Sequence, residues 1–82
     1  MINVRVKLFA RAKDVAGVAE DAFTLPDATT VAGLRQALVD RYPPLADILK
    51  HSALAVNEEF ADDTTVLTDG AVVALLPPVS GG

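Results

Sequence analysis

Residues 69–76 of the chain read Asp-Gly-Ala-Val-Val-Ala-Leu-Leu, and this stretch decides the fold. The Asp-Gly pair is typical of a β-hairpin turn, and every residue after it is apolar. A strand that is apolar on both faces has no side suited to water, so it is expected in the middle of a sheet. Residues 71–76 therefore predict a central strand that needs a neighbour on each side.

The N-terminal segment supplies the first candidate neighbour. From residue 2 to residue 10, apolar and polar side chains alternate, which is typical of a strand with one buried face. Phe9 breaks this alternation because it falls on the polar face. An aromatic side chain at this position is either tucked under the following segment or held out for a partner. Pairing of this first strand with the last strand would be parallel.

One helix has a clear signature between these two strands. Thr29 and Thr30 are suited to an N-cap, and Pro43 and Pro44 end the helix because proline lacks a backbone N–H. Between them, apolar residues recur at intervals of three or four, at Val31, Leu34, Leu38 and Tyr42. The shorter predicted elements are a helical turn or loop at 11–17, a strand at 20–25, a helical turn near 45–49, a strand at 53–57, turns at 57–59 and 62–63, and a brief strand or 3-10 turn at 66–67.

The resulting element order, β-β-α-β-β, predicts an α+β protein with the β-grasp, or ubiquitin-like, fold. In this arrangement the helix at residues 30–41 packs across one face of a mixed sheet. We expect one domain at residues 1–76, followed by an extended C-terminal tail at residues 77–82.

The composition excludes several classes of protein. The chain has 82 residues, a net charge of −4 and no cysteine. The acidic balance disfavours nucleic acid and anionic membranes, and the missing thiols exclude disulfides and thiolate metal sites. No apolar run is long enough for a membrane span or a secretory signal, so we expect a cytoplasmic protein. Hydrophobic residues make up 51% of this small domain, which suggests that a partner covers part of its surface.

Catalytic constellations are sparse in the sequence. His51 is the single histidine, and serine occurs only at positions 52 and 80, so neither a nucleophile triad nor a histidine metal cluster can form. The acidic pairs at 58–59 and 62–63 are typical of solvated turns. We therefore expect no catalysis by this chain alone, no bound cofactor and no metal.

The C-terminal tail is the part of the sequence best suited to chemistry. It reads Pro77, Pro78, Val79, Ser80, Gly81 and Gly82. The prolines stiffen its exit from the strand, and a tail of this length reaches about 20 Å. Because glycine has no Cβ, Gly81 and Gly82 can pass a narrow channel and present the terminal carboxylate to another protein. A free carboxylate is a poor electrophile, so such a carrier needs an enzyme that activates it, for example by adenylation.

Several segments together resemble the small, sulfur-carrying subunit of molybdopterin synthase. They are Thr-Val-Ala-Gly-Leu-Arg at 30–35, Ala-Val-Asn at 55–57, Leu-Thr-Asp-Gly at 67–70 and Pro-Pro-Val-Ser-Gly-Gly at 77–82. The resemblance covers essentially the whole chain and keeps the order and spacing of that family. The related sulfur carrier of the thiamine pathway shares the fold and the terminal glycines, but it lacks this proline-rich approach to them.

The resemblance implies a mechanism. An ATP-dependent adenylyltransferase of the ubiquitin-activating type would adenylate Gly82, and sulfur from a cysteine persulfide would convert it to a thiocarboxylate. The tail would then enter the large synthase subunit and donate sulfur to cyclic pyranopterin monophosphate during molybdenum cofactor biosynthesis. Two small subunits would flank a dimer of large ones in a heterotetramer. This chain would bind no cofactor, because the ATP is used by the activating enzyme.

The resemblance also implies a docking patch beside the tail, and Gly81 would give Gly82 access to the reaction site. The positions it assigns to partner contact are Phe9, Phe60, Leu76, Pro77, Pro78, Val79 and Ser80. From the residues alone, Phe9 and Phe60 are also compatible with packing in the core. Three alternative functions stay open: a sulfur carrier for another, thiamine-type pathway, a protein modifier joined to lysines through Gly82, and a noncovalent interaction module.

Overall fold

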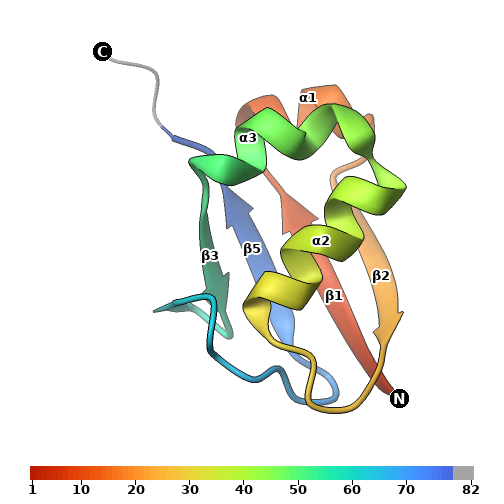
Figure 1. Cartoon of the computed structure of the whole chain (residues 1–82). Helices are drawn as coiled ribbons and strands as arrows, with labels where there is room; N and C mark the ends of the chain where they lie inside the picture. The colour runs from red at the N-terminus through yellow and green to blue at the C-terminus, as the bar shows by residue number, and fades with distance from the viewer. Residues whose placement is uncertain (79–82) are drawn as a thin grey trace.

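The computed structural model describes residues 1–78, which fold around one mixed sheet (Figure 1). Its elements are β1 (Ile2–Leu8), α1 (Ala10–Ala16), β2 (Glu20–Leu25), α2 (Val31–Arg41), the 3-10 helix η1 (Pro43–Leu45), α3 (Ala46–Lys50), β3 (Ala53–Val56), β4 (Glu59–Ala61) and β5 (Val72–Leu76). The main helix begins where the threonines predicted it, since the Thr30 hydroxyl accepts a hydrogen bond of 3.3 Å from the Gly33 N–H.

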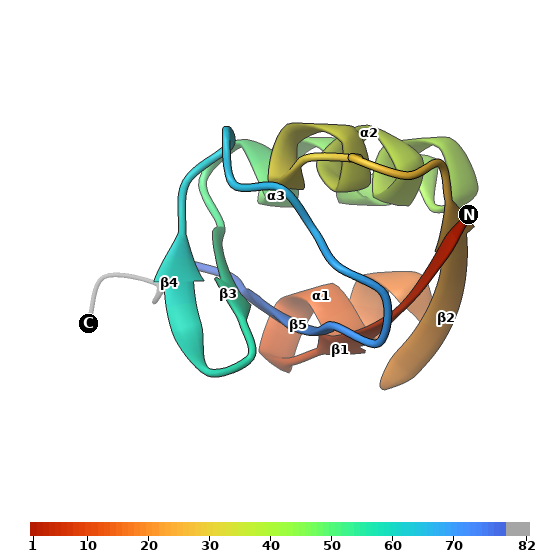
Figure 2. The same ribbon diagram turned by 90° about the horizontal axis from the view of Figure 1, so that it is seen from below.

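The sheet has the strand order β2-β1-β5-β3-β4, which puts β5 at its centre. β5 runs parallel to β1, with Val73 beside Val6 and Leu75 beside Leu8, and antiparallel to β3. Figure 2 shows α2 and α3 on one side of the sheet. This is the β-grasp topology, so the predicted α+β fold class and the parallel pairing of the first and last strands are confirmed.

The core lies between α2 and the face of the sheet that α2 covers. Val31, Leu34 and Leu38 of α2 are fully buried against Val73 and Leu75 of β5 and the alternate apolar residues of β1. Each such side chain contributes about 1.5–3 kcal/mol when it is removed from water. The two periodicities read from the sequence, about 3.6 for α2 and two for β1, therefore bring the same residues together in one layer.

The predicted first strand is too long by two residues. Phe9 is the N-cap of α1, and Ala10 has a φ of +50°, a left-handed conformation that turns the chain out of the sheet. α1 then ends at Gly17, whose φ of +79° is typical of a helix C-terminus. The segment at 11–17, for which the sequence left a choice between helical turn and loop, is a helix.

The predicted order β-β-α-β-β is wrong by one strand. The additional strand, β4, pairs with β3 and places Phe60 directly opposite Ala55. The prediction of a turn holds for residues 57–58, where Asn57 and Glu58 have φ values of +49° and +72°, but Glu59 already belongs to the strand. A strand of three residues is too short to show alternation, which is why β4 was missed.

The Asp-Gly pair at 69–70 forms a turn, but the predicted hairpin is wrong. No strand precedes it within residues 62–71, and Val66 makes only an isolated bridge to Thr30. The turn is instead tied to β1, because the Gly70 N–H donates to the Asn3 carbonyl and Asp69 Oδ1 accepts from the Asn3 N–H. The φ of +84° at Gly70 explains why glycine occupies this position.

The outer edge of β2 is occupied by side chains. Asp21 Oδ1 accepts a hydrogen bond from the Ala22 N–H, and Arg41 of α2 donates to the Ala22 carbonyl at 2.9 Å. The Tyr42 hydroxyl donates to the other Asp21 oxygen, and this bond, with smaller contributions from Arg41 and the Ala22 N–H, holds the pKa of the Asp21 carboxyl below its usual value. These contacts fasten the C-terminal end of α2 to β2 and satisfy backbone groups that would otherwise invite another strand.

The Asp21 contacts predict a pH-dependent contribution to stability. A carboxyl whose folded pKa is depressed stabilises the fold above its unfolded pKa of about 3.9, and this stability is lost as the pH falls through the folded pKa. Replacing Tyr42 by Phe should therefore lower the free energy of unfolding at pH 6 by about 1 kcal/mol, and the melting temperature should fall accordingly. The difference from wild type should shrink below about pH 4, as measured by thermal melting across pH. A difference that stays constant from pH 6 to pH 2 would contradict this assignment.

Candidate functional site

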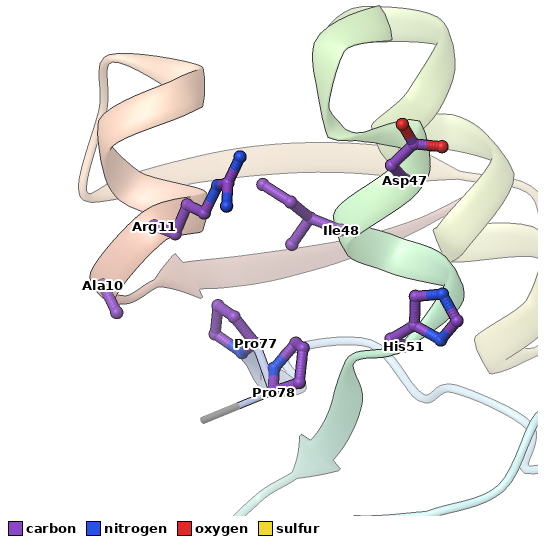
Figure 3. A pocket seen from close by; sticks show the side chains of 7 residues that line it. All are labelled: Ala10, Arg11, Asp47, Ile48, His51, Pro77 and Pro78. Atoms are coloured by element: carbon purple, nitrogen blue, oxygen red, sulfur yellow. The ribbon is translucent and has the colours of Figure 1, made fainter. Parts of the chain in front are cut away.

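The C-terminal end of β5 lies where α1 and α3 meet the sheet, and the tail begins there. Pro77 and Pro78 follow Leu76 directly and border a hollow of about 630 Å³ (Figure 3). Its other walls come from α1, α3 and the residue after α3, namely Ala10, Arg11, Asp47, Ile48 and His51. The root of the tail is thus set among ordered elements. Val79, Ser80, Gly81 and Gly82, on which the predicted chemistry depends, lie outside the described residues.

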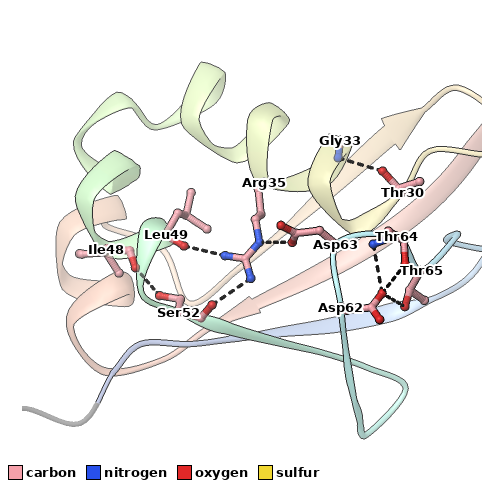
Figure 4. Close-up of polar contacts among 10 residues, drawn as sticks. All are labelled: Thr30, Gly33, Arg35, Ile48, Leu49, Ser52, Asp62, Asp63, Thr64 and Thr65. Atoms are coloured by element: carbon pink, nitrogen blue, oxygen red, sulfur yellow. Dashed lines mark hydrogen bonds and ion pairs between the residues drawn. The ribbon is translucent and has the colours of Figure 1, made fainter.

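A network centred on Arg35 of α2 holds the α3 side of this hollow (Figure 4). Its guanidinium donates to the Leu49 carbonyl at 2.6 Å and to the Ser52 carbonyl at 2.9 Å, and its Nε donates to Asp63 at 2.8 Å. The Ser52 hydroxyl donates in turn to the Ile48 carbonyl. Because Ile48 lines the hollow, this network connects the main helix to the surroundings of the tail.

The loop that presents Asp63 is itself ordered by a neighbouring carboxylate. Asp62 Oδ1 accepts hydrogen bonds from the Thr64 hydroxyl and backbone N–H and from the Thr65 hydroxyl (Figure 4). The hydroxyl of Thr64 is the largest cause of a pKa below the usual value for the Asp62 carboxyl. The acidic pair at 62–63 therefore has a structural use, which agrees with its prediction as a turn.

The face of the sheet that points away from α2 carries the predicted docking positions. This open face comprises Lys7 of β1, Val72, Ala74 and Leu76 of β5, Ala55 of β3 and Phe60 of β4. The Phe60 side chain is 77% exposed and that of Phe9, at the end of β1, is 44% exposed. Leu76 is half-buried and lies opposite Ala53. Of the two alternatives left open by the sequence, packing of the phenylalanines in the core is therefore wrong.

The open face contains one feature that the sequence did not reveal. Between the exposed Phe9 and the turn at 57–58 lies a hollow of about 590 Å³, with Ala55 and Ala74 among the residues that line it. Two isolated alanines carry no signal of their own. They become neighbours only through the pairing register of β3 with β5, in which Ala55 lies opposite Ala74.

The part of the chain that the structure describes contains neither a metal-binding cluster nor a membrane-spanning helix. Within residues 1–78 no group of three or more histidine, aspartate and glutamate side chains is placed to hold a metal ion. In the same part of the chain, no helix has the length and apolar character needed to span a membrane. The arrangement places Pro77 and Pro78, which follow β5 directly, close to the apolar residues of the open face.

Comparison with known proteins finds a matching family model and a relative that aligns over the whole chain. A model of the ThiS family matches residues 6–82. The molybdopterin synthase sulfur carrier subunit of Chlamydomonas reinhardtii is 35% identical over 83 residues, which cover 99% of this chain and all of the relative.

Two solved structures show how closely the backbone is shared. The small archaeal modifier protein 1 of Haloferax volcanii superposes with a TM-score of 0.88 at 28% identity, covering 96% of this chain and 100% of the other. A chain from the complex of subunits 1 and 2 of molybdopterin-converting factor from Helicobacter pylori superposes with a TM-score of 0.71 at 28% identity, over 99% of this chain and 100% of the other.

The Arg35 network predicts a clear difference between two substitutions. Arg35→Met should destabilise the protein by about 2 kcal/mol, because it removes the guanidinium hydrogen bonds to the Ser52 and Leu49 carbonyls, of which the Leu49 carbonyl keeps a 3.4 Å bond from the Ser52 N–H. For a domain of this size the loss corresponds to roughly 10 °C in melting temperature. Asp63→Asn is the control, since Asp63 is 60% exposed and its ion pair with Arg35 contributes at most about 1 kcal/mol. Equal melting temperatures for Arg35→Met and wild type would contradict this role.

Proposed function

Because the chain belongs to the ThiS family and to its molybdopterin synthase sulfur carrier subunits, we propose that Gly82 carries sulfur as a terminal thiocarboxylate. One observation carries the proposal: the central strand β5 ends beside the exposed phenylalanines and continues directly into Pro77 and Pro78. A tail that begins there enters a partner while the open face docks against it. The folded domain provides the docking surface, and Gly82 carries the transferred sulfur.

The proposed chemistry proceeds in two stages. An ATP-dependent adenylyltransferase transfers AMP from ATP to the Gly82 carboxylate and releases pyrophosphate. The outer sulfur of a cysteine persulfide then displaces AMP to give an acyl disulfide, and a second thiol cleaves this acyl disulfide, which leaves the thiocarboxylate on Gly82 and forms a disulfide between the two thiols. Adenylation is required because a carboxylate is a poor electrophile, whereas AMP is a good leaving group. This chain contributes the carboxyl group and its access. It has no cysteine, so no internal thiol competes for the activated terminus.

The second stage takes place in the large subunit of molybdopterin synthase. The tail enters the active site of that subunit and the thiocarboxylate transfers sulfur to cyclic pyranopterin monophosphate. We propose that Phe9, Phe60 and Leu76 dock against the large subunit, with two copies of this chain flanking a dimer of large subunits. The Helicobacter pylori complex of subunits 1 and 2 of molybdopterin-converting factor supports a large subunit as the partner. On this proposal the chain binds no cofactor, and ATP is consumed by the activating enzyme.

A second candidate function is modification of proteins. The similarity to the small archaeal modifier protein 1 of Haloferax volcanii favours it, because the two backbones match over nearly the whole chain. An activated Gly82 attacked by a lysine amine, rather than by sulfur, would give an isopeptide conjugate. The two functions differ in the nucleophile and not in the carrier, so they are separated by the products formed after activation.

Changes at the terminus should abolish sulfur loading without affecting the fold. Deletion of Gly82, or addition of one alanine after it, removes or displaces the reactive carboxyl group and leaves the core untouched. Intact-mass spectrometry after coexpression with the activating enzyme should show exchange of one oxygen for sulfur in the wild type and no exchange in either variant. Melting temperatures should agree within error. Sulfur loading of the alanine-extended chain, with the alanine still attached, would rule out the proposed chemistry.

Phe60→Ala tests docking. Because Phe60 is 77% exposed, removal of its ring should change the melting temperature little, whereas truncation of a core phenylalanine would cost about 3–5 kcal/mol. Binding to the large subunit should weaken by about 2 kcal/mol, as expected for an aromatic anchor, when measured by calorimetry. Val66→Ala provides a control, since Val66 is exposed but pairs with Thr30 at the start of α2. Wild-type affinity in Phe60→Ala would move the docking patch elsewhere.

A further inference from the structure

The hollow on the open face is formed by the register of four neighbouring strands. We call it the alanine hollow, and it is lined by Lys7, Phe9, Ala55, Asn57, Glu58, Val72 and Ala74. The register sets Phe60, Ala55, Ala74 and Lys7 side by side across four strands, β4, β3, β5 and β1. The methyl groups of Ala55 and Ala74 thus lie between the much larger side chains of Phe60 and Lys7, which leaves a depression in the surface above the two alanines.

The part of the alanine hollow formed by the turn at Asn57 and Glu58 is fixed by hydrogen bonds. The Asn57 N–H donates to the Val72 carbonyl at 2.8 Å, and the Val72 N–H donates to Asn57 Oδ1 at 2.9 Å. These reciprocal bonds hold the left-handed turn at Asn57 and Glu58 against β5. A recess whose walls are set in this way is preorganised, so a side chain can enter without reordering the sheet.

The lining of the alanine hollow carries two charges, the ammonium group of Lys7 on β1 and the carboxylate of Glu58 in the turn after β3, and the partner carboxylate is expected on the Lys7 side. The cross-strand neighbour of Lys7 is Glu20, but the Glu20 carboxylate pairs with Arg5. Within residues 1–78 no ion pair involves Lys7. An apolar floor beside an ammonium group suits an apolar side chain with a carboxylate close to it.

The number of residues between Pro78 and Gly82 limits how far from this surface a protein that takes up Gly82 can lie. Four residues follow Pro78, and a chain of four residues spans at most about 14 Å. Any protein that takes Gly82 into an active site must therefore approach the end of β5 closely. The alanine hollow is continuous with the proposed docking positions, because Phe9 lines it and Ala74 lies two residues from Leu76 on the same face of β5.

We propose that the alanine hollow receives one bulky apolar side chain, branched or aromatic, from the large subunit of molybdopterin synthase, with a carboxylate of that subunit beside Lys7. The inference rests on the proposed function, since it deepens the assignment of the large subunit as the partner. It adds a recess to the exposed phenylalanines, so that each protein inserts a side chain into the other. Ala55 and Ala74 then determine specificity through their small size.

Filling the recess tests the inference. Ala74→Leu should weaken binding of the full chain to the large subunit about tenfold or more, because the added side chain occupies the space of the incoming one. Ala22→Leu makes the same change at an exposed alanine of β2, the edge strand farthest from β4 and outside the proposed docking positions, and should bind like wild type. Melting temperatures of both variants show whether the fold is kept, and Ala74→Val supplies a smaller filling if Ala74→Leu melts early.

The charge is tested separately. Lys7→Glu should weaken binding more at low salt than at high salt, since it replaces an attraction by a repulsion that ions screen. Wild-type affinity of a folded Ala74→Leu, or of Ala74→Val in its place, would overturn the inference and leave the proposed function standing. Absence of binding by the wild type would overturn both. If the wild type dimerises and Ala74→Leu abolishes only this dimerisation, a second copy is the occupant and the inference is wrong.

Discussion

Parallel pairing of β1 with β5 is the constraint on which the rest of the structure depends. It joins the two ends of the chain in the middle of the sheet, with Val6 beside Val73 and Leu8 beside Leu75. Once β5 is central, one face must be covered by α2, because Val73 and Leu75 have to be buried. On the other face β5 presents Val72, Ala74 and Leu76, of which Val72 is exposed and the other two are half-buried. The same pairing fixes where β5 ends, and hence where the tail begins.

The proposed function depends on the position at which β5 ends and the tail begins. Leu76 is the last residue of a strand held on both sides, so Pro77 starts from a rigid base. The Arg35 network steadies α3, which forms one wall beside the prolines. On the proposed function, such a carrier contributes its terminal carboxyl group and leaves substrate recognition to its partners.

The elements of the fold that have long, regular patterns could be predicted from the sequence. Short elements, and features that depend on strand register, could not. The uniform apolarity of residues 71–76 predicted the central strand, and the spacing of Val31, Leu34 and Leu38 predicted the helix. β4 escaped because three residues show no period. The alanine hollow escaped because Ala55 and Ala74 are 19 positions apart in the sequence and meet only in the folded sheet. The Asp-Gly turn signal was correct, but it could not reveal which strand would be the partner.

Transfer of sulfur from the chain to a pterin tests the central claim most directly. The wild-type protein, loaded with labelled sulfur by its activating enzyme, is mixed in a single turnover with the large subunit and cyclic pyranopterin monophosphate. The account predicts that the label leaves Gly82 and appears in the dithiolene, with two loaded chains consumed for each product because a dithiolene contains two sulfur atoms. Retention of the label on the chain, or formation of the product at the same rate from unloaded chain, would contradict it.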